Sequence, residues 1–136
     1  MAASKPHAPV QRVSITDEAA ALVARLVSRH GPLLFHQSGG CCDGSAPMCY
    51  PRQDFKVGQN DVYLGDIADQ PFYIGGLQYE YWSHTQLTID ITPGRGGGFS
   101  VEAPEGFRFV TVSRLFSDDE WRALTDAGPV ARGPQH

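Results

Sequence analysis

The order of the predicted elements constrains the fold most: one helix near each end of the chain, and short β-rich segments between them. We expect the first helix over residues 17–30, with Thr16 as N-cap and Gly31 followed by Pro32 as its end. Its apolar residues recur at helical spacing and predict one face packed on a sheet: Leu22, Val23, Leu26 and Val27. Strands and helices do not alternate along the chain, so the sequence predicts an α+β fold with a mostly antiparallel or mixed sheet of short strands.

The predicted strands lie in runs rich in β-branched and aromatic residues, bounded by turn residues: 32–37, 61–67, 71–75, 86–92, 99–103 and 107–115. In the fourth, Leu87, Ile89 and Ile91 alternate with polar residues, which is typical of a strand with one face in water. The C-terminal helix is expected to begin after Ser117, because Glu120 completes a capping box. We expect residues 1–12 to be disordered, residues 13–128 to form a single domain, and residues 129–136 to form a loose tail.

Charge and hydropathy exclude several functional classes. The formal net charge is -4, and no basic stripe with interleaved aromatic residues is present, so the chain is not expected to bind nucleic acid. No apolar run approaches the roughly 20 residues of a membrane helix, and residues 1–12 lack the apolar core of a signal peptide. We therefore expect a cytoplasmic protein with reduced thiols and no membrane contact.

All three cysteines, Cys41, Cys42 and Cys49, fall within residues 36–49, among glycines and small polar residues. Cysteines that serve as small core hydrophobes are not expected to cluster in a glycine-rich loop, so this pattern indicates chemistry. Thiolates bind zinc, copper(I), iron or an iron–sulfur cluster, and backbone amides in such a loop can stabilise the thiolate form. The alternatives are a redox-active or nucleophilic thiol, with Cys41 or Cys42 as the catalytic residue, and inert packing.

Two histidines are candidate partners of these thiols. His36 lies on the predicted strand just before the loop and is expected to be a fourth metal ligand, a base that deprotonates a thiol, or a hydrogen-bonded structural residue. His84 follows the most aromatic stretch of the chain, in which Tyr79, Tyr81 and Trp82 predict either core packing or the wall of a small apolar pocket.

The run "SITDEAAALVARLVSRHGPLLFHQSGGCCDG" and the later "YIGGLQYEYWSHTQLTIDI" resemble the HesB-like A-type iron–sulfur carriers over residues 14–106. The resemblance implies a HesB-like fold, an iron–sulfur site at Cys41, and packing of the segment around His84 near the cysteine loop. The carriers end in a Cys-x-Cys-Gly motif, whereas no cysteine follows Cys49 here.

The segments "LLFHQSGGCCDGSAPMCYP" and "QYEYWSHTQLTIDITPGRGGGFSVEAPEG" resemble a family of small bacterial proteins catalogued as a domain of unknown function. Its members are often encoded beside aldehyde dehydrogenases, which implies a partner that oxidises aldehydes or alcohols. The chain itself contains no dinucleotide-binding motif and cannot be such a dehydrogenase.

Three functional hypotheses follow from these patterns. The first is a carrier, sensor or maturation factor that binds a metal ion or cluster through Cys41, Cys42 and Cys49, with His36 or His84 completing the site. The second is a small thiol-dependent enzyme that attacks an aldehyde or another electrophile. The third is a structural accessory subunit. Separately, short strands and exposed aromatic residues make a homodimer an expected assembly.

Overall fold

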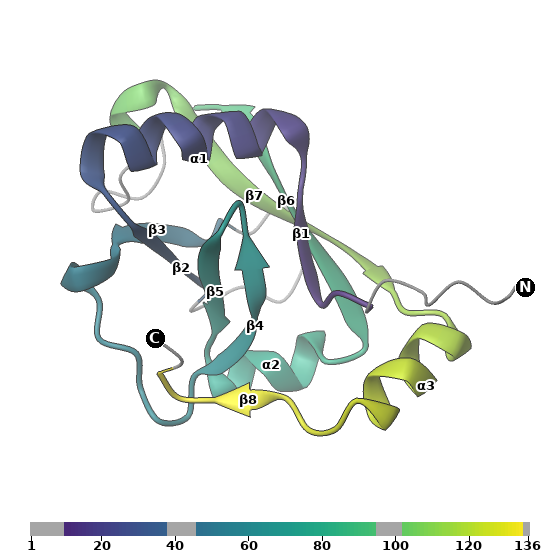
Figure 1. Cartoon of the computed structure of the whole chain (residues 1–136). Coiled ribbons are helices and arrows are strands. Elements are labelled where there is room, and N and C mark those ends of the chain that lie inside the picture. Colours follow the sequence, from purple (N-terminus) through teal and green to yellow (C-terminus); the bar gives the residue numbers. More distant parts are fainter. Residues whose placement is uncertain (1–9, 38–45, 95–101, 135–136) are drawn as a thin grey trace, which may run out of the picture.

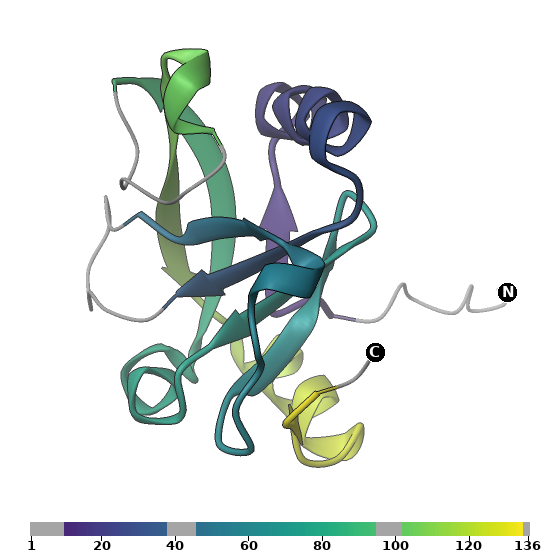
Figure 2. The same cartoon turned by 90° about the vertical axis from the view of Figure 1, so that its left-hand side faces the viewer.

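The computed structural model describes residues 10–37, 46–94 and 102–134, which form an α+β domain with two mixed sheets packed against each other (Figures 1 and 2). The smaller sheet has the strand order β1 (Val13–Ile15), β6 (Thr85–Pro93) and β7 (Phe107–Leu115). The larger sheet has the order β3 (Met48–Pro51), β2 (Leu33–Gln37), β5 (Gln70–Ile74), β4 (Val62–Ile67) and β8 (Ala131–Arg132). The pairs β1–β6 and β2–β5 are parallel, and the other pairs are antiparallel.

The described helices lie at two opposite ends of the molecule (Figure 1). At one end is α1 (Asp17–His30), and at the other are α2 (Gly76–Trp82) and α3 (Asp118–Asp126). Two 3-10 turns complete the elements, η1 (Arg52–Asp54) and η2 (Ala103–Glu105). No helix in the described ranges is long and apolar enough to cross a membrane.

The first helix follows the sequence prediction closely. The Thr16 hydroxyl accepts a hydrogen bond from the backbone N–H of Ala19 at 3.2 Å and donates to Asp90 Oδ1 at 2.9 Å, so the cap also joins α1 to β6. Of the predicted apolar face, Leu22, Val23 and Leu26 are buried and Val27 is half-buried; Ala19 is buried as well. Gly31 has φ = 80°, a conformation that suits glycine at a helix end.

Aromatic contacts join the two sheets in the core. Phe35 of β2 stacks on Phe72 of β5, with ring centroids 6.1 Å apart. The same ring meets the edge of Phe109 of β7 at 5.1 Å, across the space between the sheets. Both geometries are favourable for aromatic pairs. The inner face of β2 is therefore fixed against β7.

Several elements differ from the prediction. Residues 76–82 form a third helix, α2, which was not predicted from the sequence, and the strands form two sheets rather than one. The short strands β1, β3 and β8 were not predicted from the sequence; β8 lies in the segment expected to be a loose tail. The strand expected over 99–103 was wrong at its described end, because η2 begins at Ala103; residues 99–101 lie outside the described residues. Of the N-terminal segment expected to be disordered, residues 1–9 are outside the described part, and the carbonyl of Arg12 accepts a hydrogen bond from Leu87 N–H at 2.9 Å.

Candidate functional site

Cys49 is the cysteine of the predicted loop that the structure describes; Cys41 and Cys42 lie outside the described residues. Cys49 sits on β3 directly opposite Phe35 of β2, and its exposed fraction is 0%. Residues directly opposite each other in an antiparallel pair point to the same face of the sheet. The thiol therefore points into the space between the two sheets, where Phe35 meets Phe109.

A buried carboxylate lies near this thiol. Glu102, just before η2, has an exposed fraction of 0%, and its charge acts electrostatically on Cys49. Burial raises the pKa of the Cys49 thiol well above its ordinary value, and the charge of Glu102 raises it further. Without a cation, Cys49 is therefore a protonated thiol at neutral pH.

A second pair of buried polar side chains lies on the same inner face. Gln37, the last residue of β2, accepts a 2.9 Å hydrogen bond at Oε1 from the hydroxyl of Thr111 on β7. Gln37 shares the face of Phe35, because side chains alternate along a strand, and Cys49 shares that face too. Cys49, Glu102, Gln37 and Thr111 are together called the interior polar residues below. They are buried beside the point at which the chain continues towards Cys41 and Cys42.

His36 is on the opposite face of the larger sheet. His36 pairs with Met48 across the ladder, so these two side chains share a face. Cys49 is the next residue after Met48, and its side chain therefore points to the opposite face from that of His36. His36 Nε2 lies 2.9 Å from Asp61 Oδ1, and the other oxygen of Asp61 accepts a 2.8 Å hydrogen bond from Gly58 N–H. The imidazole ring also packs on Phe55, with centroids 4.8 Å apart. The structure therefore does not bring His36 to Cys49 as a shared metal ligand or as its base.

His84 does not share a site with Cys49 either. It lies between α2 and β6, and its ring packs on Trp121 of α3 with centroids 4.2 Å apart. The strand β6 begins beside Leu115 and ends beside Phe107, close in sequence to Glu102. His84 and Glu102 thus flank opposite ends of the β6–β7 ribbon, and the expected packing of His84 near the cysteine loop is not seen at Cys49.

The three aromatic residues that were predicted to form either core packing or a pocket wall lie on α2 and differ in their exposure. Trp82 is 4% exposed and belongs to the hydrophobic core, whereas Tyr81 is 73% exposed. Tyr79 is partly buried and packs against the core. Core packing, one of the two alternatives from the sequence, is thus the role of Trp82 and Tyr79.

A complete metal-ligand set is not present within residues 10–37, 46–94 and 102–134, where no group of three or more His, Cys, Asp or Glu side chains is arranged to hold an ion. The described residues offer one sulfur, from Cys49, and the nearby carboxylate of Glu102. Glu102 was not predicted as a site residue because it lies in a segment that the sequence predicts to be an ordinary strand. A useful signal was the acidic residue among the apolar residues of "FSVEA".

Comparison with family models places residues 22–115 in the family described as "Domain of unknown function (DUF779)". The matched span includes Cys49, Glu102, Gln37 and Thr111, whereas α3 and β8 lie beyond it. Comparison with curated proteins and with solved structures gives no match.

Proposed function

Because the chain belongs to the family "Domain of unknown function (DUF779)", whose description names no activity, we propose a function from its own residues. We propose that the protein binds a thiophilic metal ion, or a small iron–sulfur cluster, with Cys49 and Glu102 as ligands from the core. Cys41 and Cys42, eight and seven residues before Cys49 in sequence, are the proposed further ligands. The observation that carries this proposal is that a fully buried thiol and a fully buried carboxylate interact electrostatically.

The electrostatics of this pair support a cation. Cys49 and Glu102 are both fully buried and interact electrostatically, and a cation bound by both would offset the cost of burying their negative charges. A bound cation reverses the local pKa relationship: it favours the thiolate of Cys49 that the metal-free environment disfavours. Binding therefore releases a proton, and the metal affinity is expected to rise with pH.

The chemistry of the donors narrows the choice of metal. Thiolate sulfur is a soft ligand that suits copper(I), zinc and iron, whereas carboxylate oxygen is a hard ligand. Zinc accepts both sulfur and carboxylate oxygen in proteins. A site that combines Cys49 with Glu102 therefore favours zinc or iron over copper(I).

An accessory role as carrier, sensor or maturation factor follows from the resemblance described above. The same resemblance implies an enzyme of aldehyde or alcohol oxidation as the partner. Reduced thiols are required for metal binding, which supports a cytoplasmic location. No catalytic step is part of this proposal.

The test is metal content after anaerobic purification, by elemental analysis and optical spectroscopy, followed by reconstitution with Zn²⁺, or with Fe²⁺ and sulfide. We expect near-stoichiometric metal in the wild type, loss of metal in Cys49→Ser, and at least about tenfold weaker retention against a chelator in Glu102→Gln. His36→Gln is the matched control, because it alters a buried polar side chain of β2 that points to the opposite face of the larger sheet, and it is expected to retain metal.

Failure of the wild type to hold metal under all these conditions would refute the proposal. In that case, pH-dependent alkylation of Cys41 or Cys42 between about pH 5 and 8 would support the thiol-enzyme alternative instead. Retention of metal by Cys49→Ser, with loss in Cys41→Ser, would place the site outside the core.

A further inference from the structure

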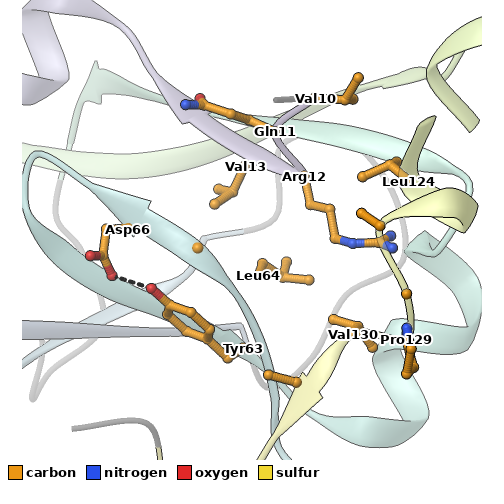
Figure 3. A pocket seen from close by; sticks show the side chains of 14 residues that line it. Val10, Gln11, Arg12, Val13, Tyr63, Leu64, Asp66, Leu124, Pro129 and Val130 are labelled. Atoms are coloured by element: carbon orange, nitrogen blue, oxygen red, sulfur yellow. Dashed lines mark hydrogen bonds between the residues drawn. The ribbon is translucent and has the colours of Figure 1, made fainter. Parts of the chain in front are cut away.

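A pocket away from Cys49 and Glu102 lies where β1, β4 and the connection from α3 to β8 meet (Figure 3). The pocket there has a volume of about 290 Å³. Its walls include apolar side chains from separate elements: Val13, Leu64, Leu124 and Val130. This composition is typical of sites for small ligands, which combine apolar walls with a few polar groups. None of the interior polar residues lines it.

Arg12 brings a cation into this apolar pocket. Its side chain extends towards the α3–β8 connection, near Pro129 and Val130 in Figure 3. The Nη1 atom is buried and has no hydrogen-bond partner among the described residues. No salt bridge links Arg12 to an acidic residue in that same part of the chain, and the guanidinium carbon lies 5.9 Å from the ring centre of Tyr79. Burying a hydrogen-bond donor without an acceptor costs free energy. An anion that accepts a hydrogen bond from Arg12 would therefore be stabilised in the pocket.

The opposite side of the pocket carries a negative charge. The Tyr63 hydroxyl donates a 2.6 Å hydrogen bond to Asp66 Oδ1, and both residues line the pocket. Figure 3 shows this pair across the apolar floor from Arg12. A ligand with a second negative charge at its far end would be repelled by the Asp66 carboxylate. The charge pattern therefore favours a single negative charge at the Arg12 end and an uncharged body.

We propose that this pocket binds a small aliphatic monocarboxylate. Its carboxylate accepts hydrogen bonds from Arg12, and its chain lies on Leu64 and Val130. Arginine suits this role because its planar guanidinium matches the geometry of a carboxylate. The site is separate from the proposed metal site and does not depend on it.

The experiment uses the full chain and three linear six-carbon probes: hexanoate, hexan-1-ol and adipate. Binding is measured by isothermal titration calorimetry and by ligand-observed NMR. We expect hexanoate to bind with the highest affinity, and Arg12→Gln to weaken this binding at least about tenfold. Arg25→Gln, which removes the same charge from the exposed face of α1, is the matched control and is expected to bind as the wild type does. Asp66→Asn should raise the affinity for adipate towards that for hexanoate.

Absence of hexanoate binding to the wild type would overturn the proposal. Equal binding by wild type and Arg12→Gln would do the same, since the carboxylate would then bind elsewhere. If the wild type binds adipate as tightly as hexanoate, Asp66 does not select against a second negative charge, and that part of the proposal is refuted. If Arg12→Gln does not fold, Arg12→Lys keeps the charge, and its affinity must still fall because the planar donor group is lost.

Discussion

Thr111 and Gln37 are 74 residues apart in sequence, yet the hydroxyl of Thr111 donates a 2.9 Å hydrogen bond to Gln37 Oε1 in the interior. Thr111 has an exposed fraction of 0% and Gln37 of 1%. The bond joins β7 of the smaller sheet to β2 of the larger sheet, at the residue from which the chain continues towards Cys41 and Cys42. Because it lies beside Cys49 on the same face, this bond is part of the frame that holds the proposed metal site.

Thr111→Val replaces the hydroxyl with a methyl group of similar shape and removes the bond between the sheets. We expect the free energy of unfolding to fall by about 1 to 3 kcal/mol, because a buried polar group of Gln37 loses a partner. The measurement is urea denaturation followed by circular dichroism. Thr125→Val, on the exposed surface of α3, serves as a control and should change the free energy by no more than about 0.5 kcal/mol. An equal effect of both substitutions would show that the bond has no special role.

Local sequence patterns predicted the parts of this fold that depend on local interactions. The N-cap at Thr16 and the capping box of Ser117 and Glu120 are both formed as expected. Leu87 and Ile89 are buried on the inner face of β6, as their alternation predicted. These features could be predicted because each depends on residues within one helical turn or one strand.

The features that could not be predicted from the sequence, namely α2, the burial of Glu102 and the face on which His36 lies, depend on tertiary packing. The segment around Trp82 forms α2 because the indole is buried in the core, although the run is rich in aromatic residues that favour strands. The burial of Glu102 beside Cys49 depends on a contact between segments more than fifty residues apart. His36 was placed near the thiols by its position in sequence, but the alternation of side chains along β2 turns it to the other face. Pairing of β3 with β2 sets this arrangement, and no local signal predicted that pairing.

The two-residue turn between β4 and β5 offers a stabilising substitution. Ala68 and Asp69 have φ values of 47° and 66°, a left-handed conformation that favours glycine over residues with a side chain. Asp69 is exposed, so Asp69→Gly should raise the free energy of unfolding by about 0.5 to 1 kcal/mol. Thermal and urea denaturation measure this change.

Ala21→Gly on the exposed face of α1 provides the contrast for this turn, because the same kind of replacement in a regular helix should destabilise by about 1 kcal/mol. Destabilisation by Asp69→Gly would contradict the left-handed geometry of the turn.

Glu120 predicts a dependence of stability on acid. Its carboxylate accepts hydrogen bonds from Arg114 at 2.8 and 2.7 Å and from Ser117 N–H at 2.9 Å, and these lower its pKa to about 2, Arg114 contributing most. A carboxylate with a lowered pKa stabilises the folded state above its unfolded pKa, and this contribution is lost as pH falls towards 2. The denaturation temperature of the wild type should therefore fall more between about pH 4.5 and 2 than that of Glu120→Gln.

The ion pair of Glu120 lies at the surface, where salt screens it. Added salt should therefore reduce the difference in acid-induced fall of denaturation temperature between the wild type and Glu120→Gln. Glu80→Gln, on the exposed side of α2, is the matched control and should follow the wild type. Identical acid profiles for wild type and Glu120→Gln would contradict the assignment.

Cys49 predicts the opposite dependence, at alkaline pH. Burial, followed by the charge of Glu102, raises the pKa of its thiol in the folded state. A group with a raised pKa contributes its full stability below its unfolded pKa, and this contribution is lost as pH rises, because the unfolded chain releases the proton first. Above the unfolded value of about 8.5, the metal-free wild type should lose up to about 1.4 kcal/mol of unfolding free energy per pH unit from this group.

Cys49→Ala removes this titration while leaving Cys41 and Cys42 in place. The difference in unfolding free energy between wild type and Cys49→Ala should therefore shrink from pH 8 to about 10 in the presence of a chelator. Measurements stop there because burial also raises the pKa of Tyr63, whose unfolded value is about 10. With Zn²⁺ present the wild-type loss should disappear, since a metal-bound thiolate carries no proton to release. Parallel pH profiles for the two proteins in the presence of the chelator would show that the Cys49 thiol has no raised pKa and would remove the basis of the proposed site.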